Sequence, residues 1–174
     1  MNDQYKSDKA SRRTTIVLFI IYLVALWWIL LLKLGVQFSY MKKRRANLIP
    51  FDEPSLLTSE NILNVIVFIP LGIYAGMLFE RWSFGKKFLV ALLLSVLVEG
   101  LQYILRLGAF DATDIVTNTL GGVIGLVIFI VLGKAFKSGL KTRKVINTIA
   151  AIGTFLMIVL LVLLKMNMLP IRYQ

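Results

Sequence analysis

Polar residues recur at helical spacing in two segments near the middle of this 174-residue chain, within sequence that is otherwise apolar. They are Glu99, Gln102 and Arg106 in the first segment, and Asp111, Asp114 and Asn118 in the second. Residues at positions i, i+3 and i+7 share one face of a helix. A face of carboxylates, amides and a guanidinium can bind a polar ligand or hold a proton, and such groups inside a membrane-spanning stretch usually mark a functional site.

The residue types that are missing narrow the chemistry further. The chain has no cysteine and no histidine, which excludes disulfides and thiolate catalysis and removes the commonest general base and zinc ligand. The carboxylates do not form a dense metal-binding motif. We therefore expect no metal site and no cofactor, and we expect binding rather than catalysis.

Long apolar stretches must position these side chains. Hydrophobic residues make up 58% of the chain and its mean hydropathy is +0.80, whereas soluble domains are about 45–50% apolar. Five stretches have the ~20 apolar residues that a membrane-spanning helix needs: 14–34, 61–79, 87–105, 112–132 and 145–164. The sequence predicts an all-α fold, a polytopic transmembrane helical bundle of about five spans that forms a single domain over residues 1–174.

The order of these stretches predicts where the polar residues meet. The turn between the third and fourth stretches is short, so Glu99 and Asn118, each about 10 Å from that turn, should lie at similar depth. Asn64 begins the second stretch on the same side, and the one long connection enters there too. We expect one ligand-binding cluster, formed by Arg44, Arg45, Asn47, Asn64, Glu99, Gln102, Arg106, Asp111, Asp114 and Asn118.

Several of these residues also have a structural alternative. Asp111 and Asp114 could cap the fourth helix, because carboxylates favour helix N-termini. Glu99 and Arg106 could form an ion pair, and the amide side chains could join neighbouring helices by hydrogen bonds. The basic run that ends at Arg45 could bind lipid phosphates.

A second set of residues is expected to pack helices together. It consists of Pro70, Gly72, Gly121, Gly122 and Gly125. Small residues four apart let two helices approach closely, and a proline inside a span kinks the helix. We expect these positions to contact protein rather than ligand.

Lysine and arginine residues set the expected orientation. The net charge is +11, but the basic residues lie between apolar runs, where they meet anionic lipid head groups, so we expect no nucleic-acid partner. Of the 20 basic residues, 12 fall on the side of the N-terminus and 8 on the other. Cytoplasmic loops carry the excess of such residues, which predicts a cytoplasmic N-terminus, an extracellular C-terminus and a polar cluster that faces outward.

The ordered motifs of residues 47–125 resemble the VanZ-like family of bacterial membrane proteins, named for a teicoplanin-resistance protein. They are the segment Asn47–Phe51, Asn64 followed by Phe68–Gly72, Glu99 with Gln102, and Asp111, Asp114 and Asn118 followed by the three glycines. The resemblance implies a multi-pass protein of the bacterial plasma membrane and a role in tolerance to teicoplanin-type lipoglycopeptides, drugs that carry an acyl chain. It does not supply a chemical mechanism.

Three hypotheses follow for the mechanism. In the first, the polar cluster binds the lipoglycopeptide or a lipid-linked cell-wall precursor, and Arg44, Arg45 and Arg106 attract its anionic group. In the second, the chain is an intramembrane enzyme on an isoprenoid-linked or phospholipid substrate, with Glu99 as proton carrier. In the third it is a lipid transporter, although the sequence shows no inverted repeat. Membrane lipids are expected partners in each case, and the sequence leaves the oligomeric state open.

Overall fold

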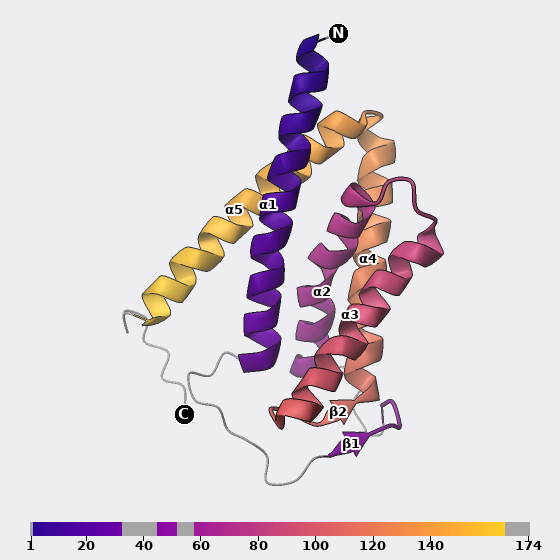
Figure 1. The fold of residues 1–174 in the computed structure, drawn as a ribbon, viewed down its shortest axis with the longest axis vertical. Coiled ribbons are helices and arrows are strands. Elements are labelled where there is room, and N and C mark those ends of the chain that lie inside the picture. The colour runs from indigo at the N-terminus through magenta and orange to yellow at the C-terminus, as the bar shows by residue number, and fades with distance from the viewer. Residues whose placement is uncertain (1, 33–44, 52–57, 166–174) are drawn as a thin grey trace.

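The computed structural model describes residues 2–32, 45–51 and 58–165 (Figure 1). The described part of the chain holds five helices, α1 (Asn2–Leu32), α2 (Ser59–Leu78), α3 (Phe84–Leu105), α4 (Ala112–Phe136) and α5 (Gly139–Lys165). Two strands of two residues each, β1 (Ala46–Asn47) and β2 (Phe110–Asp111), complete it. Each helix contains a stretch that is long and apolar enough to cross a membrane. The predicted all-α bundle of five spans is confirmed.

The helices extend beyond several of the predicted spans. Helix α1 begins at Asn2 rather than at residue 14, and the predicted connection 133–144 shrinks to residues 137–138 because α4 and α5 continue through it. Lys137 ends α4 in the left-handed region, with φ 50°. Apolar composition marks where a helix enters the membrane, whereas the helix itself continues through polar residues that favour helix formation.

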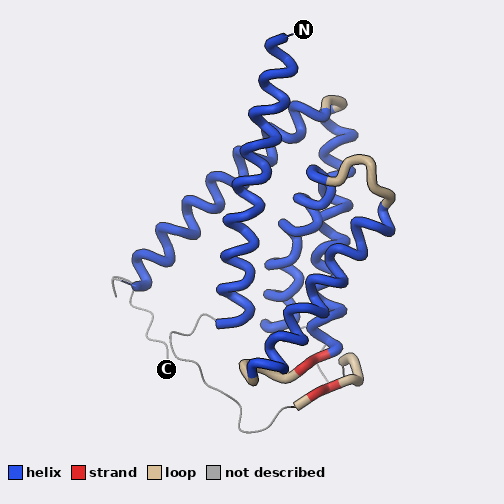
Figure 2. Tube along the Cα trace, viewed as in Figure 1, coloured by secondary structure: helices blue, strands red, loops and turns tan. Residues whose placement is uncertain are grey.

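Successive helices run in opposite directions (Figure 1). The start of α1, the α2–α3 connection and the α4–α5 connection lie at one end, called here the N-terminal end. Figure 2 shows the two strands together at the opposite end, called the strand end. The described polar residues of the predicted site belong to, or directly flank, elements that reach the strand end. The direction of the helices therefore determines how far each of these residues lies from that end.

Helices α2 and α4 pack with their backbones in contact. A Cβ atom on Gly72 would lie 1.9 Å from the carbonyl oxygen of Gly122, and one on Gly125 would lie 2.0 Å from the carbonyl oxygen of Ile69. Gly121 meets the α2 backbone in the same way, at 2.2 Å. No side chain fits at these distances, so glycine is required for the close approach that small residues give membrane helices.

The other helices pack around this pair through apolar side chains. One buried group joins Leu26 of α1, Phe68 and Leu71 of α2, and Ala91 of α3. The hydroxyl of Tyr22 donates a hydrogen bond to the carbonyl oxygen of Val67 (2.9 Å), which links α1 to α2. Pro70 lies half-buried inside α2, and the helix continues beyond it to Leu78.

Candidate functional site

The strands bring the long connection against the α3–α4 turn. Residues of β1 and β2 pair in parallel, with Asn47 opposite Asp111. The backbone N–H of Phe110 donates to the carbonyl oxygen of Arg45 (3.0 Å), and the Asn47 side-chain amide donates to the Asp111 carboxylate (3.4 Å). Two residues separated by 64 positions therefore meet at the strand end.

Asp111 connects three segments through its side chain and its backbone. It is the N-cap of α4, in extended conformation, and its carboxylate accepts a hydrogen bond from the backbone N–H of Thr113 (2.7 Å). Its own N–H donates to the carboxylate of Glu99 (3.2 Å). The capping alternative is correct for Asp111, but the carboxylate also binds Asn47, so capping is only part of what it does.

The segment after β1 folds onto the start of α4. The side-chain oxygen of Asn47 accepts from the N–H of Ile49 (3.2 Å), an Asx-type turn. The N–H of Phe51 then donates to the hydroxyl of Thr113 (3.0 Å). Phe51 has φ 59°, in the left-handed region that few non-glycine residues occupy. The connection thus covers the strand end of α4.

A second carboxylate–amide pair joins α2 to α4. The side-chain amide of Asn64, which is 9% exposed, donates to the carboxylate of Asp114 (2.8 Å). Asp114 lies in the first turn of α4 and Asn64 in the second turn of α2. Because α2 and α4 are held together by the glycine contacts described above, this short hydrogen bond depends on the separation of the two helix backbones.

The deepest polar groups of the site are Glu99 and Asn118. Glu99 is 2% exposed and Asn118 is 1% exposed. Neither the side-chain nitrogen nor the side-chain oxygen of Asn118 has a hydrogen-bond partner in the described part of the chain. A buried amide left unpaired costs about 1–3 kcal/mol, so Asn118 is a group that a ligand's hydroxyl, carbonyl or amide can stabilise.

Hydrogen bonds join five residues of the predicted site in two sets, and Asn118 lies one turn after Asp114 on α4. We call these six residues the polar cluster. They are Asn47, Asn64, Glu99, Asp111, Asp114 and Asn118. They offer carboxylate and amide oxygens together with amide N–H donors, a set suited to binding hydroxyl, carbonyl and amide groups. Among the described residues no group of three or more acidic side chains is arranged to hold a metal ion.

Comparison with known proteins places this arrangement in a family. The sequence model of the VanZ/LLP1 family matches residues 19–133, which include the whole polar cluster. The chain belongs to the VanZ/LLP1 family. It is 37% identical over 149 residues to Protein VanZ of Enterococcus faecium, covering 83% of this chain and 89% of that protein. No solved structure gives a significant match.

The remaining predicted residues of this VanZ/LLP1 chain lie apart from the cluster or outside the described residues. The side-chain amide of Gln102 donates to the carbonyl oxygen of Leu30 (2.8 Å), so it joins α3 to α1. Arg106 is the C-cap of α3 with φ 59°, is exposed, and forms no ion pair with Glu99. The side chain of Arg45 is exposed near the strands, and Arg44 lies outside the described residues.

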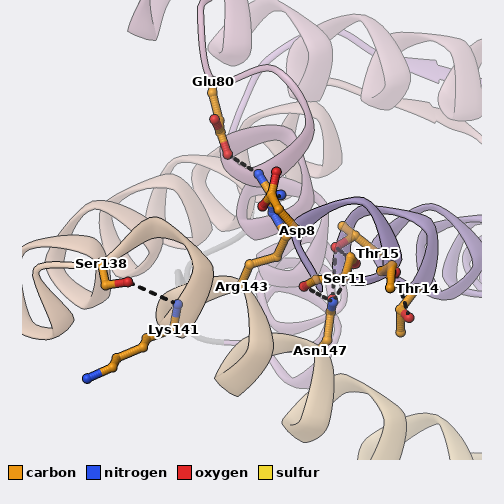
Figure 3. Close-up of polar contacts among 10 residues, drawn as sticks. Asp8, Ser11, Thr14, Thr15, Glu80, Ser138, Lys141, Arg143 and Asn147 are labelled. Atoms are coloured by element: carbon orange, nitrogen blue, oxygen red, sulfur yellow. Dashed lines mark hydrogen bonds and ion pairs between the residues drawn. The ribbon is translucent and has the colours of Figure 1, made fainter. Parts of the chain in front are cut away.

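The structure also contains polar contacts at the N-terminal end that the sequence reasoning missed (Figure 3). Arg143 of α5 is 8% exposed and forms ion pairs with Asp8 of α1 and with Glu80, which follows α2. Asn147, one turn further along α5, accepts from the hydroxyl of Thr15 (3.0 Å) and donates to the carbonyl oxygen of Ser11 (2.9 Å). We call these six residues the α1–α5 clasp.

The expectation that polar side chains gather at one end is therefore incomplete. The clasp could have been found from the spacing of Arg143 and Asn147, which lie four residues apart at the start of the last predicted span. Of its six members, only Glu80 lies within the VanZ/LLP1 match. The clasp and the polar cluster differ, because each residue of the clasp has a partner whereas the Asn118 side chain has none in the described part of the chain.

Proposed function

We propose that this VanZ/LLP1 protein confers tolerance to teicoplanin-type lipoglycopeptides by binding the drug, or a lipid-linked cell-wall precursor, at the polar cluster. The observation that carries this proposal is the unpaired amide of Asn118, which is 1% exposed and lies one turn after Asp114 on α4. A folded chain keeps such a group at a cost in stability, and a ligand that completes its hydrogen bonds offsets that cost.

The rest of the cluster supports the same role. Asn47, Asp111 and Glu99 form a continuous set of hydrogen bonds that reaches from the end of the bundle to buried depth. Basic residues lie at the same end, where the exposed guanidinium groups of Arg45 and Arg106 can attract an anionic group of the ligand. With a cytoplasmic N-terminus this end faces outward, toward the cell wall and the drug.

The test is teicoplanin susceptibility of a sensitive Gram-positive host that expresses the protein at matched membrane levels. Glu99→Gln keeps an oxygen that can accept from the N–H of Asp111 but removes the negative charge, so we expect the fold to persist and tolerance to fall. Asn118→Leu keeps the branched shape of the side chain, with larger terminal groups, and removes the unpaired amide, so we expect tolerance to fall while the protein still folds.

Asn147→Leu is the matched control, because it removes a buried amide whose hydrogen bonds are satisfied at the opposite end of the bundle. This variant should lose stability yet protect the host whenever its membrane level equals that of the wild type. Equal protection by the wild type and both cluster variants would refute the proposal. Turnover of an isoprenoid-linked or phospholipid substrate by the purified protein, abolished by Glu99→Gln, would favour the enzyme hypothesis instead.

A further inference from the structure

A separate apolar groove of about 390 Å³ lies between α1, α2, α4 and α5. Its walls include Tyr22 of α1, Pro70 of α2, Ile128 of α4 and Gly153 of α5, and no residue of the polar cluster lines it. The lining is almost wholly apolar. The hydroxyl of Tyr22 is already bonded to the carbonyl oxygen of Val67. The groove therefore selects a hydrocarbon occupant.

The depth of the groove limits what can reach it. On α5 the lining runs from Ile146 to Met157, about 16 Å along the helix axis, or roughly half of a ~30 Å hydrocarbon core. Ile146 lies seven residues after Gly139, where α5 begins, about 10 Å from the N-terminal end. The groove thus extends from about 10 Å to about 26 Å from that end along α5, through the middle of the hydrocarbon core, where lipid chains surround the protein.

The form of the groove fits a hydrocarbon chain. The groove is about 16 Å long on α5, its lining is almost wholly apolar, and it is half-open to its surroundings. In a membrane those surroundings are lipid acyl chains, so one extended chain can enter the groove from the side.

The charge at the N-terminal end favours a negatively charged lipid. Exposed basic side chains surround this end, and we call them the basic collar: Arg81, Lys86, Lys134, Lys137, Lys141 and Lys144. Asp8 and Glu80, which lie at the same end, are both paired with Arg143 and do not neutralise the collar. Juxtamembrane lysines and arginines attract anionic lipid head groups.

We propose that the groove holds one acyl chain of an anionic phospholipid whose head group lies in the basic collar. The site is distinct from the polar cluster in position and in chemistry, so it does not depend on the proposed function. A bound chain fills the space between α5 and the α2–α4 pair and acts as part of the folded protein.

Gly153 offers a direct test, because a Cβ atom there would meet nothing within 4 Å. In Gly153→Leu and Gly153→Phe the Cβ atom displaces no protein atom, and the rest of the side chain extends from a residue that lines the groove. Ala151→Phe is the matched control, since Ala151 is exposed, lies two residues away on α5 and does not line the groove. Native mass spectrometry of the full chain, released from detergent with added phosphatidylglycerol or with phosphatidylcholine of the same chain length, counts the bound lipids.

We expect the wild type and Ala151→Phe to retain one phosphatidylglycerol, and Gly153→Leu and Gly153→Phe to lose it progressively while the circular dichroism spectra stay the same. The lipid should also raise the melting temperature of the wild type and leave that of Gly153→Phe unchanged. Retention of the lipid by Gly153→Phe overturns the site. Equal retention of phosphatidylcholine overturns the role of the basic collar. A wild-type dimer that becomes monomeric in Gly153→Phe shows that a second copy, rather than a lipid, fills the groove.

Discussion

Replacing Gly72 by alanine should separate α2 from α4 and disconnect the polar cluster. The new Cβ would lie 1.9 Å from the carbonyl oxygen of Gly122, and Cβ atoms essentially never come within 3.0 Å of another heavy atom. Both sides of this contact are backbone, so no rotamer change relieves it. The two helices must move apart by at least about 1.1 Å, and overpacking of this kind costs about 1–3 kcal/mol.

The same displacement acts on the hydrogen bond between Asn64 and Asp114. At 2.8 Å it would lengthen to about 3.9 Å if the full displacement reached it, beyond the ~3.2 Å limit of protein N–H···O bonds. Gly72→Ala should therefore lower both the stability of the protein and the drug tolerance of its host. The first effect is measured by titrating the protein in detergent micelles with sodium dodecyl sulfate and following helicity by circular dichroism.

Gly133→Ala is the matched control on α4. A Cβ atom at Gly133 meets nothing within 4 Å, and alanine within a helix is favoured over glycine by about 0.5–1 kcal/mol. This variant should unfold at the same dodecyl sulfate fraction as the wild type or at a higher one. If Gly72→Ala unfolds at the wild-type fraction, or if the two variants lose stability equally, the backbone contact does not set the α2–α4 separation and the reasoning fails.

Three further predictions concern orientation and the peripheral helices. In the cysteine-free chain, a membrane-impermeant maleimide should label Leu48→Cys but not Lys137→Cys in intact cells, and the reverse pattern would show that the strand end faces the cytoplasm. Arg143→Gln should cost about 1 kcal/mol, because its two carboxylate partners are more than half exposed and return to water; an unchanged dodecyl sulfate midpoint would contradict this. Tyr22→Phe removes the hydrogen bond to Val67 and should cost about 0.5–1.5 kcal/mol in the same titration, whereas an increase in stability would show that the bond contributes nothing.

Hydropathy predicted the helices because every span must bury its backbone polar groups in its own hydrogen bonds. The spacing argument assumes a continuous helix, so it applies within α3 and not beyond the end of that helix. Glu99 lies within α3 and reaches Asp111, but Arg106 is the left-handed C-cap of that helix, so the seven-residue spacing no longer places the two on one face. A helix end is set by backbone conformation, which the apolar pattern does not report.

The contact between Asn47 and Asp111 could not be read from the sequence either. It depends on a parallel pair of strands only two residues long, which shows no alternating pattern and joins segments far apart in the chain. The clasp was missed for a different reason, because Arg143 was counted only as an interfacial cation. Its ion pairs with Asp8 and Glu80 show that a basic residue at a span's edge can be bound to protein rather than to lipid head groups.

The position of the glycines explains how a small bundle can hold buried polar groups without filling its core with them. Backbone contact at Gly72, Gly121 and Gly125 fixes α2 against α4, and that fixed separation allows Asn64 to bind Asp114 at the strand end. Asn118, one turn after Asp114 on α4, is 1% exposed, and its amide has no partner among the described residues. Gly121 lies three residues after Asn118 on α4, so the backbone contacts that fix α2 against α4 extend to the region of this unpaired amide. Under the proposed function, a ligand that pairs with Asn118 would therefore bind where helix packing has already fixed the backbone.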